Sequence, residues 1–380
     1  MPLIDARTLA AEPSGIGVYT LNLLRGIVAA GPDAPVSVWV RPEVARRLPA
    51  ALQASDALRL IERAGSPAHP RNLFLGGRAA ARAAAGATGD GGPGVLHVPD
   101  ILAPLCGAFR PVVTLHDVIP LVCRGELARS KKQRLIALWR ALAVRQTRRA
   151  AAVVTVSAYS AHDITRVLGV PREKIVVIHN AVTSSAPEAA AEGANGGRYV
   201  LNVGRRDPYK NVPGLVRAFA RMRAADPGLA DVRLVVVGPR DPRYPEAETE
   251  ARRLGLGDAV EFVGYVEHNA LAALYRDATV VAVPSRYEGF GLPLAEAMAA
   301  GTPVVCSDRS SLPEVAGGAA LLVDPDDEPA FAAAMGRVLN DGGLAADLGR
   351  RGRERAAAFS LRAFGERHLA LYARMAAGDV

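Results

Sequence analysis

Residues 284–305, PSRYEGFGLPLAEAMAAGTPVV, contain a turn, a helix and the start of a strand in one continuous stretch. An apolar run ends at Pro284, and a glycine-rich turn follows it. The spacing predicts a helix over 292–300, with Pro293 in its first turn, where a missing N–H loses no hydrogen bond. Gly301 can end that helix in the left-handed conformation, and the β-branched residues after it begin another strand. The stretch therefore predicts a strand–helix–strand unit of an α/β protein.

The rest of the C-terminal half repeats this alternation. Strands are expected at 199–204, 232–238, 260–266, 279–284, 302–307 and 319–323. Helices are expected at 212–225, 245–254, 269–276, 292–300, 328–340 and 344–375. Most of the strand segments lack polar alternation, which is typical of strands buried on both faces of a parallel sheet. This half is therefore predicted to be a doubly wound α/β domain.

The N-terminal half follows the same pattern. Its strands are expected at 3–6, 36–40, 95–98, 112–115, 152–156 and 175–178, and its helices at 17–30, 72–85, 130–149 and 158–168. Residues 183–197, TSSAPEAAAEGANGG, are small and polar without periodicity, and are expected to link domains 1–182 and 198–360. Open parallel sheets bind ligands beyond the carboxyl ends of their strands. We therefore expect two facing Rossmann-like domains with a ligand-binding cleft between them.

Composition narrows the class of protein. The chain has 380 residues, half of them hydrophobic, which suffices for two well-packed domains. It has no uncharged apolar run of about 18 residues, so no membrane-spanning helix is expected. Cys106, Cys123 and Cys306 form neither a disulfide framework nor a zinc pattern, which fits a reducing cytoplasm. The net charge of +8 fits either solubility or an anionic partner, but no nucleic-acid-binding motif accompanies it.

The turn before the predicted helix at 292–300 has the features of an anion site. Amides at a helix start, here near 289–292, suit a phosphate at the carboxyl end of a strand. Glu288 and Glu296 flank this helix start, and carboxylates there can accept hydrogen bonds from sugar and ribose hydroxyls. Alternatively, Glu296 only complements the helix dipole and Glu288 is solvated. The strand–turn–helix context favours the ligand-binding interpretation.

Residues 202–211, NVGRRDPYKN, provide cations at the end of another buried strand. Gly204 ends the strand, and Arg205 and Lys210 follow before the next helix. Two cations in this position can hold a diphosphate and stabilise it as it leaves. Ordinary surface charge is the alternative, above all for Arg206.

Two motifs in the N-terminal half are weaker. Gly15 and Gly17 form a G-x-G after the first strand, but Thr20 replaces the third glycine of a dinucleotide fingerprint, so a tight structural turn is equally plausible. His116 and Asp117 follow the strand at 112–115. His116 could bind a substrate hydroxyl with Asp117 orienting it, or it could be structural.

Residues 129–149, RSKKQRLIALWRALAVRQTRR, contain many basic residues and no acid. Their apolar residues fall partly on one helix face, which is expected at least to pack against the core. The segment could dock on an anionic membrane surface, or it could be a solvated basic face.

Together these motifs make the chain resemble a retaining glycosyltransferase of family 4, whose GT-B fold consists of two facing Rossmann-like domains. The resemblance covers essentially the whole chain. It rests on SGIGVYT (14–20), LHDVIPL (115–121), NVGRRDPYKN, the block from Glu288 to Val305, and SSLPEV (310–315). The final helix, near 361–375, would by this resemblance pack back on the first domain.

The resemblance implies a set of site residues. Donor-binding positions would be Gly15, Gly17, Gly204, Arg205, Lys210, Glu288, Gly289, Phe290, Gly291, Leu292 and Glu296. Catalytic positions would be His116, Arg205, Lys210 and Glu288, and acceptor-side positions Tyr19, His116 and Asp117. Arg205 and Lys210 would hold the diphosphate, while Glu288 would contact the donor sugar and Glu296 the ribose.

The resemblance also implies a reaction. A hexose would move with retention of configuration from a nucleotide sugar to a glycan or lipid-linked glycan, without a metal or another cofactor. The SGIG-Y and HD-x-I-P motifs look most like those of bacterial mannosyltransferases of surface polysaccharides. GDP-mannose is therefore the first donor expected, ahead of a UDP-hexose. A cytoplasmic protein, peripheral at the inner membrane face, would suit such an acceptor. The alternative is a non-catalytic protein that binds nucleotide sugars or glycans on the same scaffold.

Overall fold

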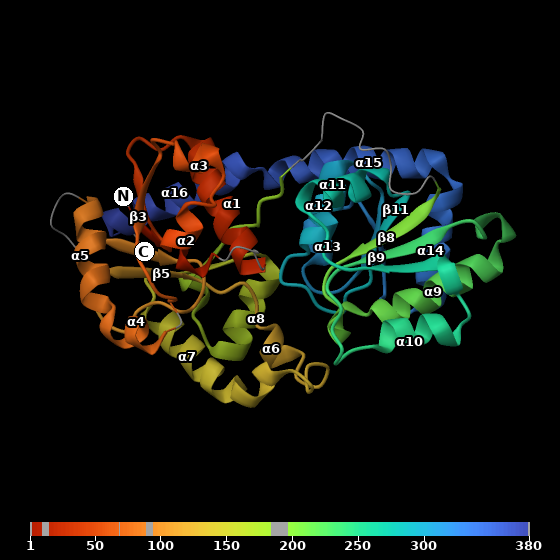
Figure 1. Cartoon of the computed structure of the whole chain (residues 1–380), viewed down its shortest axis with the longest axis horizontal. Coiled ribbons are helices and arrows are strands. Elements are labelled where there is room, and N and C mark those ends of the chain that lie inside the picture. Colours follow the sequence, from red (N-terminus) through yellow and green to blue (C-terminus); the bar gives the residue numbers. More distant parts are fainter. Residues whose placement is uncertain (1, 10–14, 68, 89–93, 184–196, 379–380) are drawn as a thin grey trace. The chain divides into compact units, whose positions relative to one another are not determined.

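The computed structural model describes residues 2–9, 15–67, 69–88, 94–183 and 197–378 (Figure 1). Apart from its two end residues, the expected linker 183–197 lies outside the described residues. The chain divides into two compact units, which we describe separately. Unit 1 comprises Met1–Val118, Leu135–Ala181 and Phe359–Val380, and unit 2 comprises Ile119–Arg134 and Val182–Ala358. These units differ from the expected domain ranges mainly at 119–134, which belong to unit 2.

Unit 1 is a parallel sheet flanked by helices. In its described part, seven strands pair in the order β3-β2-β1-β4-β5-β6-β7, and every pair is parallel. The strands are β1 Leu3–Asp5, β2 Val36–Val40, β3 Leu58–Glu62, β4 Val95–Val98, β5 Arg110–Thr114, β6 Ala152–Thr155 and β7 Ile175–Val177. The α-helices are α1 Gly15–Ala30, α2 Pro42–Ala45, α3 Ala50–Gln53, α4 Pro70–Leu75, α5 Gly77–Thr88, α7 Ile136–Arg149, α8 Ala158–Leu168 and α16 Leu361–Ala377.

The sequence prediction missed strand β3 and merged two helices. β3 lies at the edge of the sheet, and its charged Arg59 and Glu62 are exposed, so the segment lacks the apolar run that identified the other strands. The single helix expected at 72–85 is two helices, α4 and α5. They separate at Gly77, where a Cβ would collide with the carbonyl of Cys106.

Helix α16 packs closely on α1 within unit 1. The two backbones meet at Gly26 and Gly365, where a Cβ on either glycine would run into the backbone of the other helix. The single helix expected at 344–375 is therefore wrong. It is α15, Gly342–Ala356, in unit 2, followed by a short 3₁₀ helix and then α16. The Ser360 hydroxyl caps the first turn of α16 by accepting from the Ala363 amide.

Unit 2 has the same architecture. In its described part, six strands pair in parallel in the order β10-β9-β8-β11-β12-β13. They are β8 Tyr199–Val203, β9 Arg233–Val237, β10 Val260–Val263, β11 Val280–Val283, β12 Val304–Ser307 and β13 Leu321–Val323. Its α-helices are α6 Ile119–Val122, α9 Val212–Ala225, α10 Glu246–Arg253, α11 His268–Asp277, α12 Leu292–Ala300, α13 Leu312–Ala316, α14 Glu328–Asn340 and α15. The expected α/β fold class is confirmed.

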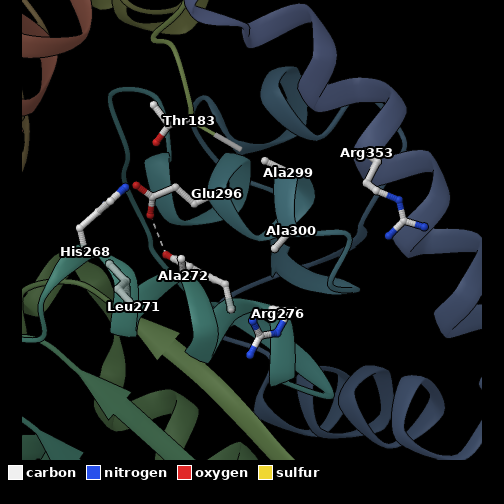
Figure 2. Close-up of a pocket in the computed structure, with 10 residues that line it drawn as sticks. Thr183, His268, Leu271, Ala272, Arg276, Glu296, Ala299, Ala300 and Arg353 are labelled. Carbon is white, nitrogen blue, oxygen red and sulfur yellow. Dashed lines mark hydrogen bonds between the residues drawn. The ribbon is translucent and has the colours of Figure 1, made fainter. Parts of the chain in front are cut away.

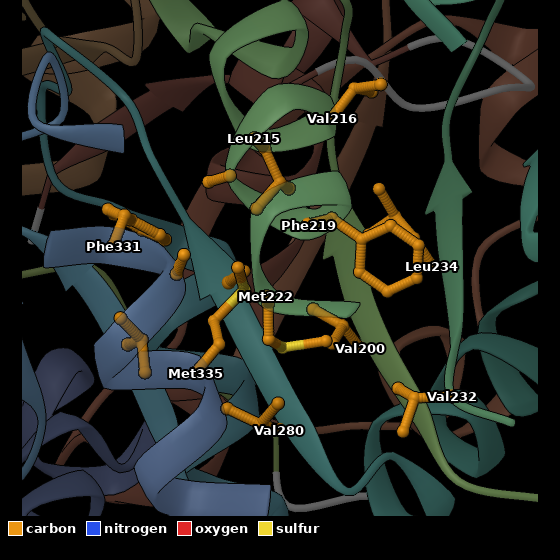
Figure 3. Close-up of a cluster of buried hydrophobic side chains, with 14 of the residues drawn as sticks. Val200, Leu215, Val216, Phe219, Met222, Val232, Leu234, Val280, Phe331 and Met335 are labelled. Carbon is orange, nitrogen blue, oxygen red and sulfur yellow. The ribbon is translucent and has the colours of Figure 1, made fainter. Parts of the chain in front are cut away.

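The core of unit 2 lies between its sheet and helices α9 and α14 (Figure 3). Phe219 of α9 and Phe331 of α14 are fully buried there, together with Met222 and Met335. Burying side chains of this size contributes about 2 kcal/mol each. This packing fixes the sheet, and with it the loops at the carboxyl ends of the strands.

No helix in the described part of the chain is long and apolar enough to cross a membrane.

Candidate active site

The loops predicted to bind a donor meet at one edge of the unit 2 sheet. Strands β8 and β11 are parallel neighbours. Their carboxyl ends therefore lie side by side, and the loop at 204–211 approaches the loop at 284–291. A backbone hydrogen bond of 2.7 Å from the Arg286 amide to the Tyr209 carbonyl joins the two loops directly.

Lys210 and Glu288 form the central contact of this edge. Lys210 Nζ lies 2.6 Å from Glu288 Oε1, and the Ser285 hydroxyl donates to the same oxygen at 2.8 Å. The Glu288 side chain is 8% exposed and that of Lys210 is 18% exposed. A partly desolvated ion pair of this kind is strong only when its geometry is good, as here. Both residues were predicted to bind a donor, and the structure brings their side chains into direct contact.

Two serines of the loop after β12 hold the backbone of Glu288. Its amide donates to Ser310 Oγ at 3.0 Å, and the Ser311 hydroxyl donates to its carbonyl at 3.0 Å. The sequence analysis gave these serines no role, although they belong to the SSLPEV motif. Ser310 and Asn211 are the two non-glycine residues with positive φ in the described part of the chain. Both adjoin the Lys210–Glu288 pair, and backbone strain of this kind concentrates at functional sites.

Arg205 and Arg206 differ in environment. Arg205 is 59% exposed and donates to Asp207 at 2.8 Å, which raises the pKa of its guanidinium. Arg206 was left open as a surface charge, but it is buried, bonds Glu248 at 2.5 Å and lies over the Phe262 ring. It therefore has a structural role, while Arg205 retains access to solvent.

Glycines shape both loops. Gly204 has a φ of +142°, and a Cβ on Gly238, at the end of β9, would collide with its carbonyl. Gly291 precedes α12 with a φ of +98°, and a Cβ there would lie 2.6 Å from a methyl of Leu312. The N-cap residue of α12 is Gly291, which has no side chain to cap the first turn, and Gly301 ends the helix with a φ of +80°, as predicted. Phe290 is buried, while Leu292 and Gly289 complete the turn.

Glu296 lines a pocket of about 230 Å³ formed by α11, α12 and Thr183 (Figure 2). Figure 2 shows Glu296 and His268 pointing toward one another across it. The Tyr275 hydroxyl donates to Glu296 Oε2 at 2.8 Å. Burial raises the pKa of Glu296 to about 7, against the lowering effect of this hydrogen bond. Glu288 and Lys210 are not among the residues that line this pocket.

The predicted residues of unit 1 surround the end of β5. His116 Nε2 donates to the Pro99 carbonyl at 3.2 Å, and its ring meets Tyr19 edge-on at 4.6 Å. Burial lowers the pKa of His116 to about 4, so the ring is neutral at pH 7 with an unprotonated Nδ1. Asp117 is half-buried beside it. Gly15 and Gly17 lie in the first turn of α1, which begins two residues earlier than expected, rather than in a loop.

Tyr19 was predicted on the acceptor side, but its hydroxyl is used inside unit 1. His368 Nδ1 lies 2.9 Å from the Phe364 carbonyl and must donate to it. Burial lowers the pKa of His368 to about 4, so Nε2 carries no proton and accepts from the Tyr19 hydroxyl at 2.9 Å. Because this proton is already donated to His368, Tyr19 cannot donate it to a sugar acceptor.

Tyr19 is part of a longer chain of hydrogen bonds inside unit 1. The Tyr19 oxygen accepts from the Thr114 hydroxyl at 3.3 Å, and Thr114 accepts from His97 Nε2 at 2.9 Å. His97 Nδ1 then accepts from the Tyr372 hydroxyl at 2.5 Å. Burial lowers the pKa of His97 as well, which agrees with one proton on its ring. A directional chain of hydrogen bonds thus ties α16 to β4, β5 and α1, behind His116.

Two sequence-family models together cover most of the chain. The model described as "Glycosyl transferases group 1" matches residues 186–355, and "Glycosyltransferase Family 4" matches residues 13–186. An MMP α-(1→4)-mannosyltransferase of Mycolicibacterium hassiacum is 33% identical over 290 residues, covering 74% of this chain and 68% of the relative. The chain belongs to glycosyltransferase family 4.

Further comparisons place this glycosyltransferase among enzymes with several names. The O-antigen chain mannosyltransferase B of Escherichia coli is 32% identical, over 65% of each chain. A D-inositol 3-phosphate glycosyltransferase of Kribbella flavida is 36% identical over 56% of this chain and 54% of the relative. Sucrose-phosphate synthase of Thermosynechococcus elongatus has a TM-score of 0.71 and 26% identity over the whole of both chains. The predicted enzyme class and GT-B fold are confirmed.

The family assignment leaves the individual site roles as predictions. In the part of the chain that the structure describes, no three His, Cys, Asp or Glu side chains gather in a way that could hold a metal ion. Unit 2 brings together Lys210, Glu288 and Ser285, with Arg205 on the same loop. Glu296 occupies its own pocket, and His116 belongs to unit 1.

Proposed function

We propose that this glycosyltransferase transfers a hexose from a nucleotide sugar with retention and without a metal ion, with GDP-mannose as the first donor to test. The observation that carries this proposal is the Lys210–Glu288 pair at the carboxyl edge of the unit 2 sheet, with the exposed Arg205 on the same loop as Lys210. Cations at this edge would stabilise the charge on a leaving diphosphate, and the Glu288 carboxylate would accept hydroxyl protons of the donor sugar. The names of two mannosyltransferase relatives support mannose.

The proposed donor site also uses Glu296. Its carboxylate lines a pocket of suitable size for a pentose ring, on the same helix whose N-terminus follows Glu288. His116 would meet the donor sugar with its unprotonated Nδ1 as a hydrogen-bond acceptor. A neutral ring at this pKa would not serve as a general acid at pH 7. The leaving diphosphate oxygen would take the proton of the acceptor instead.

A donor panel tests the proposal. GDP-mannose, UDP-glucose and UDP-N-acetylglucosamine are compared by thermal shift and by release of nucleoside diphosphate, with and without an added glycan acceptor. We expect the largest shift and the fastest release with GDP-mannose, unchanged by EDTA. Binding without release in any acceptor mixture would favour the non-catalytic alternative. An anomeric proton signal showing that the product has the opposite anomeric configuration to the donor would contradict retention.

We propose in addition that a surface of unit 1 docks on an anionic membrane that holds the acceptor. Helix α7 buries Ala143, Gln146 and Thr147, while Leu135 and Leu138 are 63% and 65% exposed. The expectation that the apolar residues of 129–149 pack against the core is therefore wrong for these two leucines.

Helix α4 adds to the same surface. Phe74 and Leu75 are 60% and 73% exposed. The loop at 103–107 bonds both helices, through a 2.8 Å bond from the Leu105 amide to the Leu73 carbonyl and a bond from Gln146 to the Ala103 carbonyl. Exposed Arg140, Arg145 and Arg148 on α7 supply positive charge. Exposed apolar side chains together with exposed arginines on α7 suit an anionic bilayer.

Sedimentation with vesicles tests this surface. The variant Phe74→Ser/Leu138→Ser should lose most of its sedimentation with phosphatidylglycerol vesicles, and neutral vesicles should bind neither protein. Leu322→Ser, at an exposed leucine of unit 2, is the control. Equal sedimentation of both variants and the parent protein would reject the surface.

A further inference from the structure

Three arginines lie at the carboxyl edge of the unit 1 sheet, apart from the residues discussed above. Strands β1, β2 and β3 are parallel neighbours, and Arg7, Arg41 and Arg63 follow their respective ends. The Arg63 amide donates to the Val40 carbonyl at 2.8 Å, so the ladder continues past the strand ends. Arg41 and Arg63 are therefore lateral neighbours on one face of the sheet.

The ring of Trp39 holds two of these guanidinium groups. Trp39 is buried, and the Cζ atoms of Arg63 and Arg7 lie 4.1 Å and 5.1 Å from its ring centroid. An arginine that contacts an aromatic ring through its flat face keeps its N–H edge open for hydrogen bonds. The ring thus fixes the Arg63 guanidinium without using its donors.

The positive charge of this cluster is incompletely neutralised. The buried carboxylate of Asp5 is committed to Arg7, with bonds of 2.6 and 2.8 Å. Among the described residues, no carboxylate lies within ion-pair distance of Arg63. Burial lowers the pKa of Arg63 and the charge of Arg7 lowers it further, while the charge of Asp5 raises it in part. An added anion would relieve this repulsion between two guanidinium groups.

Arg41 extends the cluster toward the start of α1. Its Nη2 donates to the Leu9 carbonyl at 2.5 Å, and its Nη1 pairs with the exposed Glu43 at 3.1 Å. Its Nε is buried and has no hydrogen-bond partner among the described residues.

We infer that Arg63 and Arg41, with Arg7 behind them, form a subsite for a phosphoryl group of the sugar acceptor. A phosphoryl oxyanion carries up to two negative charges and accepts bidentate hydrogen bonds, which matches two adjacent guanidinium groups. Assigning the phosphoryl group to the acceptor rests on the proposed function, because unit 2 carries the proposed donor residues. The group could belong to a soluble sugar phosphate or to a lipid-linked phosphate.

Inorganic phosphate is the first probe, titrated by calorimetry at constant ionic strength. The Lys210→Gln protein serves as the background, so that phosphate attraction at the donor loop is reduced. Adding Arg63→Gln should weaken phosphate binding about tenfold, the loss expected for charged hydrogen bonds. Arg59→Gln removes the same charge from an exposed position on β3, the strand that Arg63 follows, and should leave binding unchanged.

Two results would overturn the subsite. One is equal phosphate affinity with and without Arg63→Gln in proteins with the same circular dichroism spectrum. The other is an equal response to chloride, which would indicate ionic strength alone. If Arg63→Gln unfolds, Arg63→Lys is the second variant. It keeps the charge but loses the planar guanidinium that can bind an oxyanion bidentately, so it should still bind phosphate more weakly than the background protein.

Two further probes identify the source of the phosphate. Binding of glucose 6-phosphate and of a polyprenyl phosphate in detergent micelles is measured for the background protein and for Arg63→Gln. The compound whose binding is lost in Arg63→Gln identifies the source of the phosphate. If Arg63→Gln binds both compounds as well as the background protein does, the subsite is overturned. Release of nucleoside diphosphate from the donor with an unphosphorylated glycan acceptor should persist in Arg63→Gln. Absence of release in the parent protein with every donor and acceptor mixture would refute the proposed function but leave the phosphate result standing.

Discussion

Lys210 Nζ lies 2.6 Å from Glu288 Oε1, so the two residues expected to hold opposite parts of a nucleotide sugar neutralise each other. A diphosphate and a sugar hydroxyl would replace each half of this pair. The pair therefore keeps a cation and an anion in place, with little exposure, before a donor binds. Ser285, Ser310 and Ser311 hold the glutamate independently of Lys210.

Removing Lys210 should reduce both stability and activity. Lys210→Met leaves the buried Glu288 carboxylate with the hydrogen bond from the Ser285 hydroxyl but without its counter-charge. We expect a loss of about 1–3 kcal/mol in the free energy of unfolding, measured by urea titration. Turnover should fall at least about 100-fold, because stabilisation of the leaving group is lost. Glu288→Gln should lower turnover as strongly but stability less.

The double variant separates the two effects. Lys210→Met/Glu288→Gln has no uncompensated charge, so part of the stability should return while turnover stays low. Arg362→Met breaks an exposed pair with Glu366 and should cost no more than about 0.5 kcal/mol. A double variant as unstable as Lys210→Met would contradict the charge-based explanation.

The placement of this pair could be predicted from sequence because each residue follows an apolar strand. Parallel pairing then brings the ends of β8 and β11 together once the strand order makes them neighbours, and that order comes from the structure. The serine contacts could not be predicted, since they depend on the left-handed conformation of Ser310, 22 positions after Glu288. The same limit applies to Arg206, whose burial depends on Phe262 and Glu248 in two distant elements.

Strand β3 and the hydrogen bonds of His97 and His368 were not predicted, for different reasons. β3 buries only Leu58 and exposes Arg59 and Glu62, so it lacks the apolar run used to find the other strands. His97 and His368 are separated by most of the chain, and each occurs in an ordinary sequence context. Their connection becomes visible only when α16 packs against α1.

Glu296→Gln should stabilise the unliganded protein at neutral and higher pH. The pKa of Glu296 is raised to about 7 from an ordinary value of 4.5, so the folded state holds a proton that the unfolded state loses between these values. Its contribution to stability is therefore full below pH 4.5 and is lost as the pH rises to 7. Glutamine can still accept from Tyr275 and carries no charge.

Thermal midpoints from pH 4.5 to 8 test this linkage. The midpoint of Glu296→Gln should exceed that of the parent by an amount that grows up to about pH 7 and then stays constant. Donor affinity of the variant should fall at the same time, because the proposed ribose contact is lost. A difference that does not change with pH would show that this carboxyl group does not titrate in that range.

Acid should destabilise unit 1 through its buried histidines. The pKa values of His116 and His368 are lowered to about 4, and that of His97 is lowered too, all primarily by burial. Between pH 6.5 and 4 the unfolded chain binds protons that the folded state rejects, so stability falls as the pH falls. His368→Gln removes one of these groups, and the urea midpoint should depend less steeply on pH in this range.

A matched variant controls for other acid effects. His69 is exposed, and its replacement by Gln should leave the pH dependence as it is in the parent protein. An identical slope in His368→Gln would mean that the buried ring does not contribute, and that the hydrogen-bond chain tolerates a charged imidazole.

The contact between α1 and α16 should depend on two glycines. A Cβ on Gly365 would meet the backbone of Gly26, and no side chain can move aside to make room. Gly365→Ala should therefore force the helices apart and destabilise the protein by about 1–3 kcal/mol, despite the better helix propensity of alanine.

Gly86 lies in helix α5 with open space around its Cβ position. Gly86→Ala should leave stability unchanged or raise it by up to about 1 kcal/mol. Urea unfolding of both variants, followed by circular dichroism, compares them directly. If the two substitutions have the same effect, close backbone packing at Gly365 does not hold α16 in place, and the hydrogen bonds from Tyr19 and Tyr372 must supply most of that stability.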